Sequence, residues 1–275
     1  MSQIETNKMG RRPIYCLVLC AVLMALSFVL GMIKIIPMPY GGSITLASML
    51  PIVLLSYRHG LVWGLASGVV YGGIQQLLGL NTLSWVTTWQ SILAVILLDY
   101  VVAFAGTGLG GVFRKGVKNQ AVALSLGTLL ACVLRYVCHV ISGCTVWAGL
   151  SIPTSAALLY SFGYNATYMI PETIVTVAAA YYLGSVLDFR KAQPTRLEKP
   201  QQTGKPIFGW IAGLLVAGGL IFDAVAVFSK LQNAETGDFM ITGLADVAWM
   251  PVIAVTAGCL LVAGVLMVVK KKTAK

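Results

Sequence analysis

Long apolar runs, repeated from one end of the chain to the other, constrain its fold more than any other feature. A membrane-spanning helix needs about 20 predominantly apolar residues to cross a hydrocarbon core roughly 30 Å thick. We interpret eight segments as such spans: 14–33, 43–57, 60–79, 91–113, 120–148, 156–187, 207–229 and 245–269. Because lipid cannot hydrogen-bond exposed backbone groups, helices are the elements that such runs form there. The sequence therefore predicts an all-α integral membrane protein.

The composition excludes several other classes. Charged residues make up 10% of the chain, against about 25% in soluble domains. A soluble enzyme, a disordered chain and a nucleic-acid-binding domain are therefore ruled out. The formal net charge of +10 comes from basic residues that flank the apolar runs. Their natural partner is the anionic cytoplasmic leaflet of a lipid bilayer, and not a nucleic acid.

The basic residues also predict an orientation. Of the 19 Lys and Arg residues, all but Lys34, Lys230 and the intramembrane Arg135 lie on one side when eight spans are assumed. Cytoplasmic loops carry the excess of Lys and Arg. We therefore predict that both termini are inside, in the plasma membrane of a bacterium.

One polar, proline-containing segment divides the chain. We predict a six-span core over 1–188, a cytoplasmic linker over 189–206, and a two-span C-terminal extension of unknown role over 207–275. No sequence repeat is visible, so an inverted-repeat transporter is not supported.

Motifs for cofactors, metals and catalysis are absent from the sequence. The six cysteines form no C-x-x-C pair, so neither a zinc site nor a disulfide framework is expected. No phosphate-binding G-x-x-x-x-G-K-[ST] loop exists, so any ATP drive must come from a partner. No H-E-x-x-H, no G-x-S-x-G and no paired catalytic aspartates support an enzyme.

Two glycine motifs favour close helix packing. The stretch 106–111 (GTGLGG) matches a dinucleotide-binding pattern, but it ends a membrane helix and lacks the preceding strand. Gly64, Gly68 and Gly72 are spaced one helical turn apart. Small residues at this spacing let helices approach closely.

Polar side chains inside the spans are the candidate functional residues, because they are costly in lipid and mark sites or pathways. They are Asp99, the i, i+4 pair Arg135 and His139, and the i, i+7 pair Asn165 and Glu172. Trp147 and Tyr160 lie nearby in sequence. One interpretation is structural: Arg135 neutralises Asp99 or Glu172, His139 is a satisfied core residue, and Trp147 anchors the helix at the membrane interface.

The other interpretation is a ligand site. Carboxylates accept hydrogen bonds from amines, and an amide both donates and accepts. Trp and Tyr faces attract flat cations. This chemistry suits a small, flat, nitrogen-rich cation, but spacing alone does not name it.

Four stretches then show a resemblance: 41–52 (GGSITLASMLPI), 98–100 (LDY), 139–147 (HVISGCTVW) and 164–172 (YNATYMIPE). They resemble the thiamine-specific S-components of energy-coupling factor (ECF) transporters, the ThiT/YuaJ-type family. The likeness covers about residues 14–188. Ala21 and Ala25 also resemble the small-residue stripe by which S-components dock on their coupling subunit.

The resemblance implies a six-helix protein that captures thiamine from outside with high affinity. It implies a complex with one transmembrane coupling subunit and two ABC ATPases. By position, Asp99 would face the aminopyrimidine and Trp147 would stack on it, while Tyr100 would lie near the hydroxyethyl end. The rest of the implied pocket lining consists of His139, Tyr160 and Asn165.

The sequence departs from the family pattern in three ways. The carboxylate is Asp99, where the family often has a longer glutamate, so a longer hydrogen bond or a shift of the helix is expected. Some members place a tryptophan over the thiazolium where this chain has Gly42. Its substitute would be Tyr40, Trp85 or Trp89. The two C-terminal spans exceed the six-helix pattern.

A second functional hypothesis remains at this point. The chain would be a solitary proton-coupled transporter, with Asp99, Glu172 or His139 as the proton relay. The six-span core without a repeat favours the S-component. Uptake without any ATPase partner would favour the solitary transporter.

Overall fold

The computed structural model describes residues 13–37, 42–149, 154–191, 193–197, 206–231 and 241–273. The chain forms two compact units, Met1–Leu197 and Glu198–Lys275. Six helices of the described residues are long and apolar enough to cross a membrane, five of them in the first unit. The prediction of a helical membrane protein is therefore confirmed.

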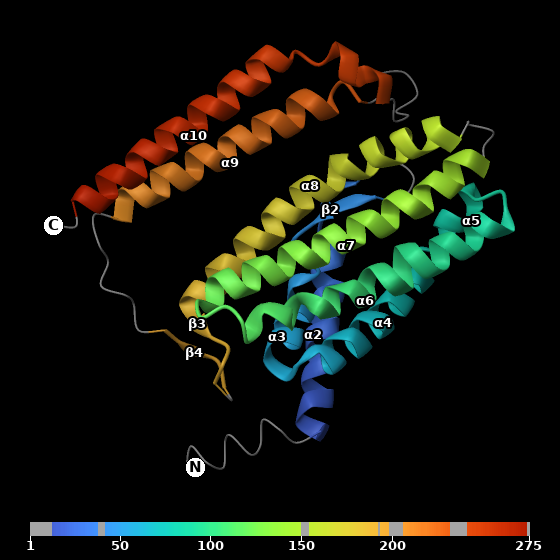
Figure 1. Cartoon of the computed structure of the whole chain (residues 1–275), viewed down its shortest axis with the longest axis horizontal. Helices are drawn as coiled ribbons and strands as arrows, with labels where there is room; N and C mark the ends of the chain where they lie inside the picture. The colour runs from blue at the N-terminus through green and yellow to red at the C-terminus, as the bar shows by residue number, and fades with distance from the viewer. Residues whose placement is uncertain are drawn as a thin grey trace. The chain divides into compact units, whose positions relative to one another are not determined.

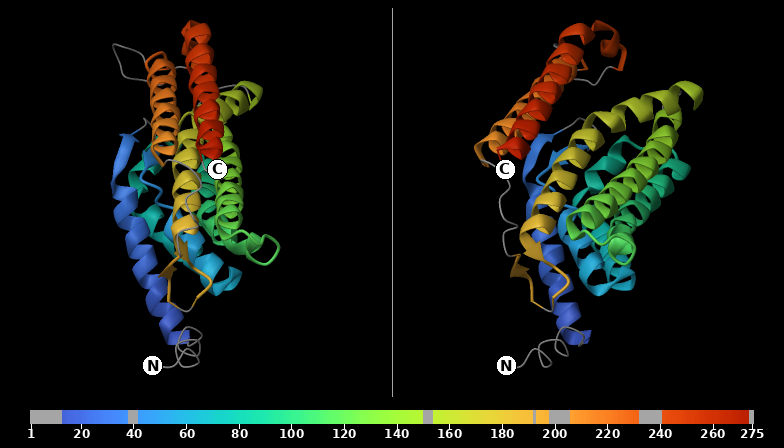
Figure 2. Two further views of the ribbon diagram at one scale, coloured as in Figure 1. Left: turned by 90° about the vertical axis from the view of Figure 1, so that its left-hand side faces the viewer. Right: turned by 60° about the vertical axis from the view of Figure 1, so that its left-hand side comes forward.

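Long helices build the first unit (Figures 1 and 2). Two of them, α7 and α8, lie side by side along most of their length, and α4 packs against the segment from η3 to η4. The elements are α2 (Pro13–Met32), α4 (Leu61–Leu78), η2 (Leu80–Trp85), α5 (Trp89–Ala94), η3 (Val95–Val102), α6 (Ala103–Thr107), η4 (Gly108–Arg114), α7 (Gln120–Gly149) and α8 (Thr154–Val186).

The predicted span over 43–57 has a different structure. Strand β2 (Ser43–Thr45) pairs antiparallel with β1 (Lys34–Pro37), and α3 begins only at Leu50 and ends at His59. Ten residues of helix rise about 15 Å, half of the hydrocarbon core. The prediction of a full-length span here is therefore wrong. The apolar run instead becomes a buried short helix, whose residues from Leu50 to Tyr57 are all buried.

Local chemistry explains why the helix does not begin earlier. Pro51 lies in the first turn of α3, where a missing N–H costs no helical hydrogen bond. Upstream, the backbone N–H of Thr45 donates to the Glu172 carboxylate on α8. That N–H is therefore bonded to α8 and does not take part in an α-helical hydrogen bond.

Glycines on α4 let this helix approach η3, α6 and η4 closely, as the spacing of the glycines predicted. A Cβ on Gly68 of α4 would lie 2.3 Å from the carbonyl oxygen of Phe104, and one on Gly72 would lie 2.5 Å from that of Tyr100. Gly108 faces the backbone of Gly64 in the same way. The two glycine motifs therefore pack against each other.

We expect Gly68→Ala to lower the melting temperature in detergent, because the added methyl group collides with backbone. Overpacking of this kind costs about 1–3 kcal/mol. Gly73→Ala on the same helix is the matched control, since no atom lies within 4 Å of its Cβ position. The control should be neutral or stabilising, because alanine favours helix over glycine. Equal melting temperatures for the two variants would contradict the packing role.

The second unit is a helical hairpin. Helices α9 (Pro206–Phe228) and α10 (Trp249–Lys272) pack together, and η5 (Ile241–Asp246) precedes α10. The Thr256 hydroxyl on α10 donates to Asp223 Oδ2 on α9 at 2.6 Å. Of the two helices, α10 meets the length and hydropathy of a span over its described residues. A membrane span for α9, and the inside position of both termini, stay predictions.

The predicted linker contains a small piece of regular structure. Strands β3 (Leu187–Asp188) and β4 (Thr195–Arg196) pair antiparallel at the end of the first unit. Gln120 on α7 fixes this turn: its Nε2 donates to the carbonyl oxygens of Gly184 and Leu187, and its Oε1 accepts from the N–H of Phe189.

Candidate functional site

A cavity of about 560 Å³ lies inside the first unit. Its described lining comes from the end of α2, from β1 and β2, and from α4, η2, η3, α6, α7 and α8. The volume falls in the range of about 300–1,000 Å³ that is usual for small-molecule sites. Four of the predicted site residues line it together: Asp99, Tyr100, His139 and Asn165.

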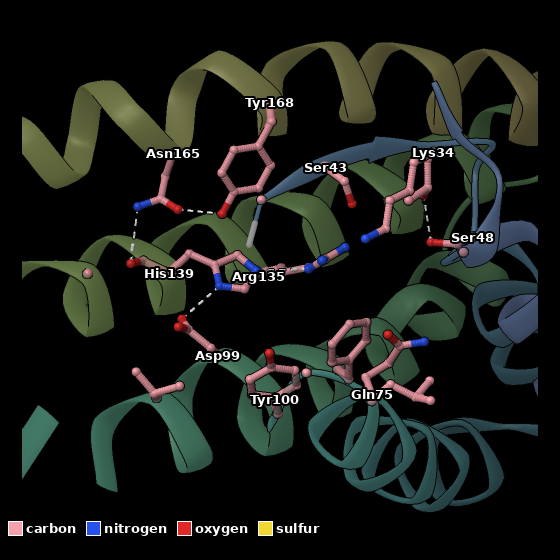
Figure 3. A pocket seen from close by; sticks show the side chains of 18 of the residues that line it. Lys34, Ser43, Ser48, Gln75, Asp99, Tyr100, Arg135, His139, Asn165 and Tyr168 are labelled. Carbon is pink, nitrogen blue, oxygen red and sulfur yellow. Dashed lines mark hydrogen bonds and ion pairs between the residues drawn. The ribbon is translucent and has the colours of Figure 1, made fainter. Parts of the chain in front are cut away.

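A chain of hydrogen bonds joins three of the intramembrane polar residues (Figure 3). His139 Nδ1 lies 2.7 Å from Asp99 Oδ1, and Arg135 Nε donates to His139 Nε2 at 3.0 Å. Since arginine only donates, His139 Nε2 must accept, and its proton must be on Nδ1. The imidazole is therefore neutral and donates to Asp99. The predicted i, i+4 pairing of Arg135 and His139 is confirmed as a direct contact.

Arg135 thus reaches Asp99 through an imidazole and not by direct neutralisation. Its guanidinium also lies 4.6 Å from the centroid of the Phe104 ring, as in a cation–π contact. The Asp99 side chain is 24% exposed, against 10% for His139. Asp99 therefore has room to accept a further hydrogen bond from a ligand in the cavity.

The helix that carries Asp99 and Tyr100 is not a regular α-helix. Residues Val95–Val102 form a π-helix, which is rare and occurs often at functional sites. Its wider turn changes the direction of the side chains relative to α5 and α6. No pattern in this stretch of sequence predicts the π-helix itself.

Asn165 lines the cavity but its amide is largely used within the protein. Its Nδ2 lies 2.8 Å from the carbonyl oxygen of Ser161 and 3.2 Å from that of His139, to which it donates. Its Oδ1 accepts from the Tyr168 hydroxyl at 2.5 Å. Asn165 therefore joins α8 to α7 and orients the Tyr168 ring beside the cavity.

Two aromatic rings that are not among the predicted site residues also line the cavity. Tyr164 and Tyr168 meet edge to face on α8, with centroids 5.8 Å apart. A Cβ on Gly42 would lie 2.8 Å from the Tyr168 ring, so these rings fill the space beside Gly42. Their i, i+4 spacing within the stretch 164–172 was the sequence signal for a shared face.

Of the three aromatic substitutes expected for Gly42, Trp89 is the one whose side chain the structure describes. Tyr40 and the side chain of Trp85 lie outside the described residues. Trp89 is 67% exposed and is not among the described residues of the lining. The described aromatic side chains that adjoin Gly42 are those of Tyr164 and Tyr168.

The remaining predicted site residues either are not among the described lining residues or have side chains that the structure does not describe. Trp147 belongs to α7, but its side chain lies outside the described residues. Tyr160 is half-buried on α8 and is not among the described lining residues. Ala21 and Ala25 are exposed on α2. Among the described residues, no cluster of three or more His, Cys, Asp or Glu side chains is able to hold a metal ion.

Glu172 has the structural role that the sequence left open. It is 1% exposed, and its two carboxylate oxygens accept from the backbone N–H and the hydroxyl of Thr45, at 2.5 and 2.6 Å. Thr45 lines the cavity. Glu172 therefore fixes the β1–β2 hairpin to α8 and, with it, one wall of the cavity.

Comparison with known proteins agrees with this geometry. Residues 17–189 match the profile of the thiamine transporter protein family (Thia_YuaJ). The curated thiamine transporter ThiT of Bacillus subtilis (strain 168) is 35% identical over 181 residues, which cover 62% of this chain and 89% of that protein.

A solved structure of ThiT from Listeria monocytogenes has the same fold. The TM-score is 0.51 at 20% identity, over 62% of this chain and 93% of that one. The family and the curated relative are transporters, so the expectation that the chain is not an enzyme is confirmed. The chain belongs to the thiamine transporter protein family (Thia_YuaJ) and is a multi-pass protein of the bacterial plasma membrane.

Proposed function

We propose that this chain captures thiamine as the S-component of an ECF transporter. The observation that carries the proposal is the membrane-embedded cavity in which Asp99 is held by His139 and still partly open. A carboxylate there accepts a hydrogen bond from the exocyclic amine of the aminopyrimidine. The Bacillus subtilis relative is a thiamine transporter, which supports the same ligand.

The proposed binding mode assigns a role to each of the predicted site residues. Asp99 accepts from the aminopyrimidine, and His139 holds the carboxylate in place. Asn165 keeps the Tyr168 ring against the ligand, and Tyr100 lies toward the hydroxyethyl end. As the family resemblance implies, Trp147 stacks on the pyrimidine. The resemblance also assigns Tyr160 to the pocket, although Tyr160 is not among the described lining residues. A flat cation between aromatic faces gains cation–π energy.

Energy comes from separate proteins in this proposal. The sequence has no P-loop, so a transmembrane coupling subunit and two ABC ATPases supply the drive. The thiamine-binding core spans 1–188, 189–206 is a cytoplasmic linker, and 207–275 is an added helical hairpin.

Ligand titration tests the binding step. The purified full-length chain in detergent should lose tryptophan fluorescence on addition of thiamine, but not of riboflavin or biotin. In liposomes, uptake should then require the coupling module and ATP. Uptake by the chain alone that a protonophore abolishes would instead favour the solitary proton-coupled transporter.

We expect the double variant Ala21→Leu, Ala25→Leu to bind thiamine normally and to lose transport. Both alanines are exposed on α2, while the face of that helix toward the protein carries Cys16, Cys20 and Ser27. Leucine would keep the helix from approaching a partner helix closely. Ala66→Leu, at an exposed position of α4, is the control and should transport normally. Loss of thiamine binding by the double variant would show that this face packs internally.

A further inference from the structure

Helix α2 takes part both in the wall of the cavity and in the proposed docking surface. Its C-terminal end lines the cavity through Phe28, Gly31 and Met32. Ala21 and Ala25 are exposed on the same helix. Because the two features share one continuous helix of 20 residues, a contact that fixes α2 from the cavity side also fixes the position of the two alanines.

The hydroxyl group of Tyr71 makes such a contact. Tyr71 belongs to α4, is buried and lines the cavity. Its hydroxyl donates to the backbone carbonyl oxygen of Ser27 on α2, at 3.0 Å. Ser27 is itself buried. One turn further along α2, a Cβ on Gly31 would lie 3.2 Å from the Tyr71 hydroxyl oxygen. The hydroxyl therefore fits closely against α2 and joins this helix to α4.

Phe104 on α6 connects Tyr71 with the polar residues of the cavity. The rings of Tyr71 and Phe104 meet edge to face, with centroids 5.2 Å apart and an interplanar angle of 85°. The Arg135 guanidinium lies 4.6 Å from the centroid of the same Phe104 ring. Phe28 of α2 packs against the buried cluster that contains both rings. Phe104 is therefore in contact with Arg135 and with the residue that holds α2.

These contacts continue the hydrogen-bond chain of the site as far as α2. Arg135 donates to His139, which donates to Asp99 (Figure 3). In order, the members of the series are Asp99, His139, Arg135, Phe104, Tyr71 and the carbonyl group of Ser27. The first five members all line the cavity. A ligand that bonds to Asp99 and fills the cavity therefore restricts the whole series.

We propose that Tyr71 is a positioning residue through which an occupied cavity fixes α2 for docking. The proposal rests on the proposed function, because it takes thiamine as the ligand and Ala21 and Ala25 as the docking surface. A helix that moves relative to the rest of the protein has to be ordered when a partner helix binds to it. Bound thiamine orders α2 beforehand, so that docking costs less conformational entropy. Thiamine and the coupling subunit then strengthen each other's binding, by the same factor.

A docking titration tests the role of Tyr71. The affinity of the coupling subunit with its ATPases for the full-length chain in nanodiscs is measured without ATP, with and without saturating thiamine. In the wild type, thiamine should strengthen docking at least fivefold. Tyr71→Phe removes the hydrogen bond and keeps the ring. We expect it to lower this coupling factor about fivefold, the effect of one hydrogen bond. Because the factor is a ratio within one variant, a change in thiamine affinity alone does not alter it.

Tyr136→Phe is the matched control. The Tyr136 hydroxyl donates to the backbone carbonyl oxygen of Phe162 at 2.9 Å, and the two rings meet edge to face at 5.6 Å. This pair joins α7 to α8, so its loss should leave the coupling factor at the wild-type value. Gly31→Ala disturbs the Tyr71 contact from the side of α2, because its methyl group displaces the hydroxyl. It should also lower the factor, and it keeps the test decisive if Tyr71→Phe folds poorly.

Hydrogen–deuterium exchange tests the same link without a partner protein. Thiamine should slow the exchange of the α2 amides in the wild type and in Tyr136→Phe, and much less in Tyr71→Phe. An unchanged coupling factor or unchanged protection of α2 in Tyr71→Phe would overturn the role of Tyr71, as would a wild type in which thiamine protects nothing in α2. Protection of α2 in a wild type that does not bind the coupling subunit would instead overturn the proposed S-component function and leave the link to α2 in place.

Discussion

Asp99→Asn is expected to weaken thiamine binding by roughly ten- to more than a hundredfold in a protein that still folds. A hydrogen bond to a charged group contributes about 1.5–3 kcal/mol, which corresponds to that range. The amide oxygen can still accept from His139 Nδ1, so the helix contact survives. The amide nitrogen, however, then faces the cavity as a donor and opposes the amine of the ligand.

Two further variants separate this ligand role from a structural one. Asp99→Glu should be far milder than Asp99→Asn, because it restores the carboxylate that the family resemblance implies. If Asp99 only balances the charge of Arg135, Asp99→Asn should first reduce the folded yield, and Arg135→Gln in the same chain should rescue it. We expect no such rescue, because Arg135 contacts Asp99 only through a neutral imidazole. Wild-type affinity in well-folded Asp99→Asn would refute the ligand role.

Sequence periodicity predicted those features that depend on a single helix. Arg135 and His139 were placed on one face by their spacing, and the structure joins them directly. The glycines of α4 were predicted to admit a neighbouring helix, and they do. In both cases the spacing along one regular helix determines which side chains share a face.

Features that depend on a break in regularity were missed. The run 43–57 is apolar because it is buried in protein, and hydropathy does not distinguish burial in protein from burial in lipid. The hairpin that brings Lys34 to the cavity is formed by pairing between two short strands. No periodicity in the sequence predicts this pairing. The π-helix around Asp99 has no sequence signal either. The place of Lys34 in the cavity lining could therefore not be predicted before the fold was known.

Glu172→Ala is expected to destabilise the protein strongly and to abolish thiamine binding as a consequence. The carboxylate is buried and accepts both from the Thr45 backbone N–H and from its hydroxyl, across 127 residues of sequence. Without it, the buried Thr45 N–H loses its acceptor, at a cost of about 1–3 kcal/mol. The Thr45 hydroxyl then keeps Ser48 Oγ as its partner, at 2.8 Å. The hairpin that carries Lys34 and Ser43 would then lose its anchor on α8, and one wall of the cavity with it.

The melting temperature in detergent and the thiamine affinity measure the two effects in the same preparation. Ser185→Ala is the control on α8, because this exposed serine bonds only within its own helix and its loss should change neither value. Glu172→Gln should fall between the control and Glu172→Ala, since its amide oxygen can accept one of the two hydrogen bonds while its nitrogen opposes the other donor. In a double-mutant cycle, Thr45→Val should cost less in the Glu172→Ala background than in the wild type, because the Thr45 hydroxyl has already lost its hydrogen bond to the Glu172 carboxylate. A Glu172→Ala protein with a normal melting temperature and normal thiamine affinity would show that the hairpin is held by other contacts.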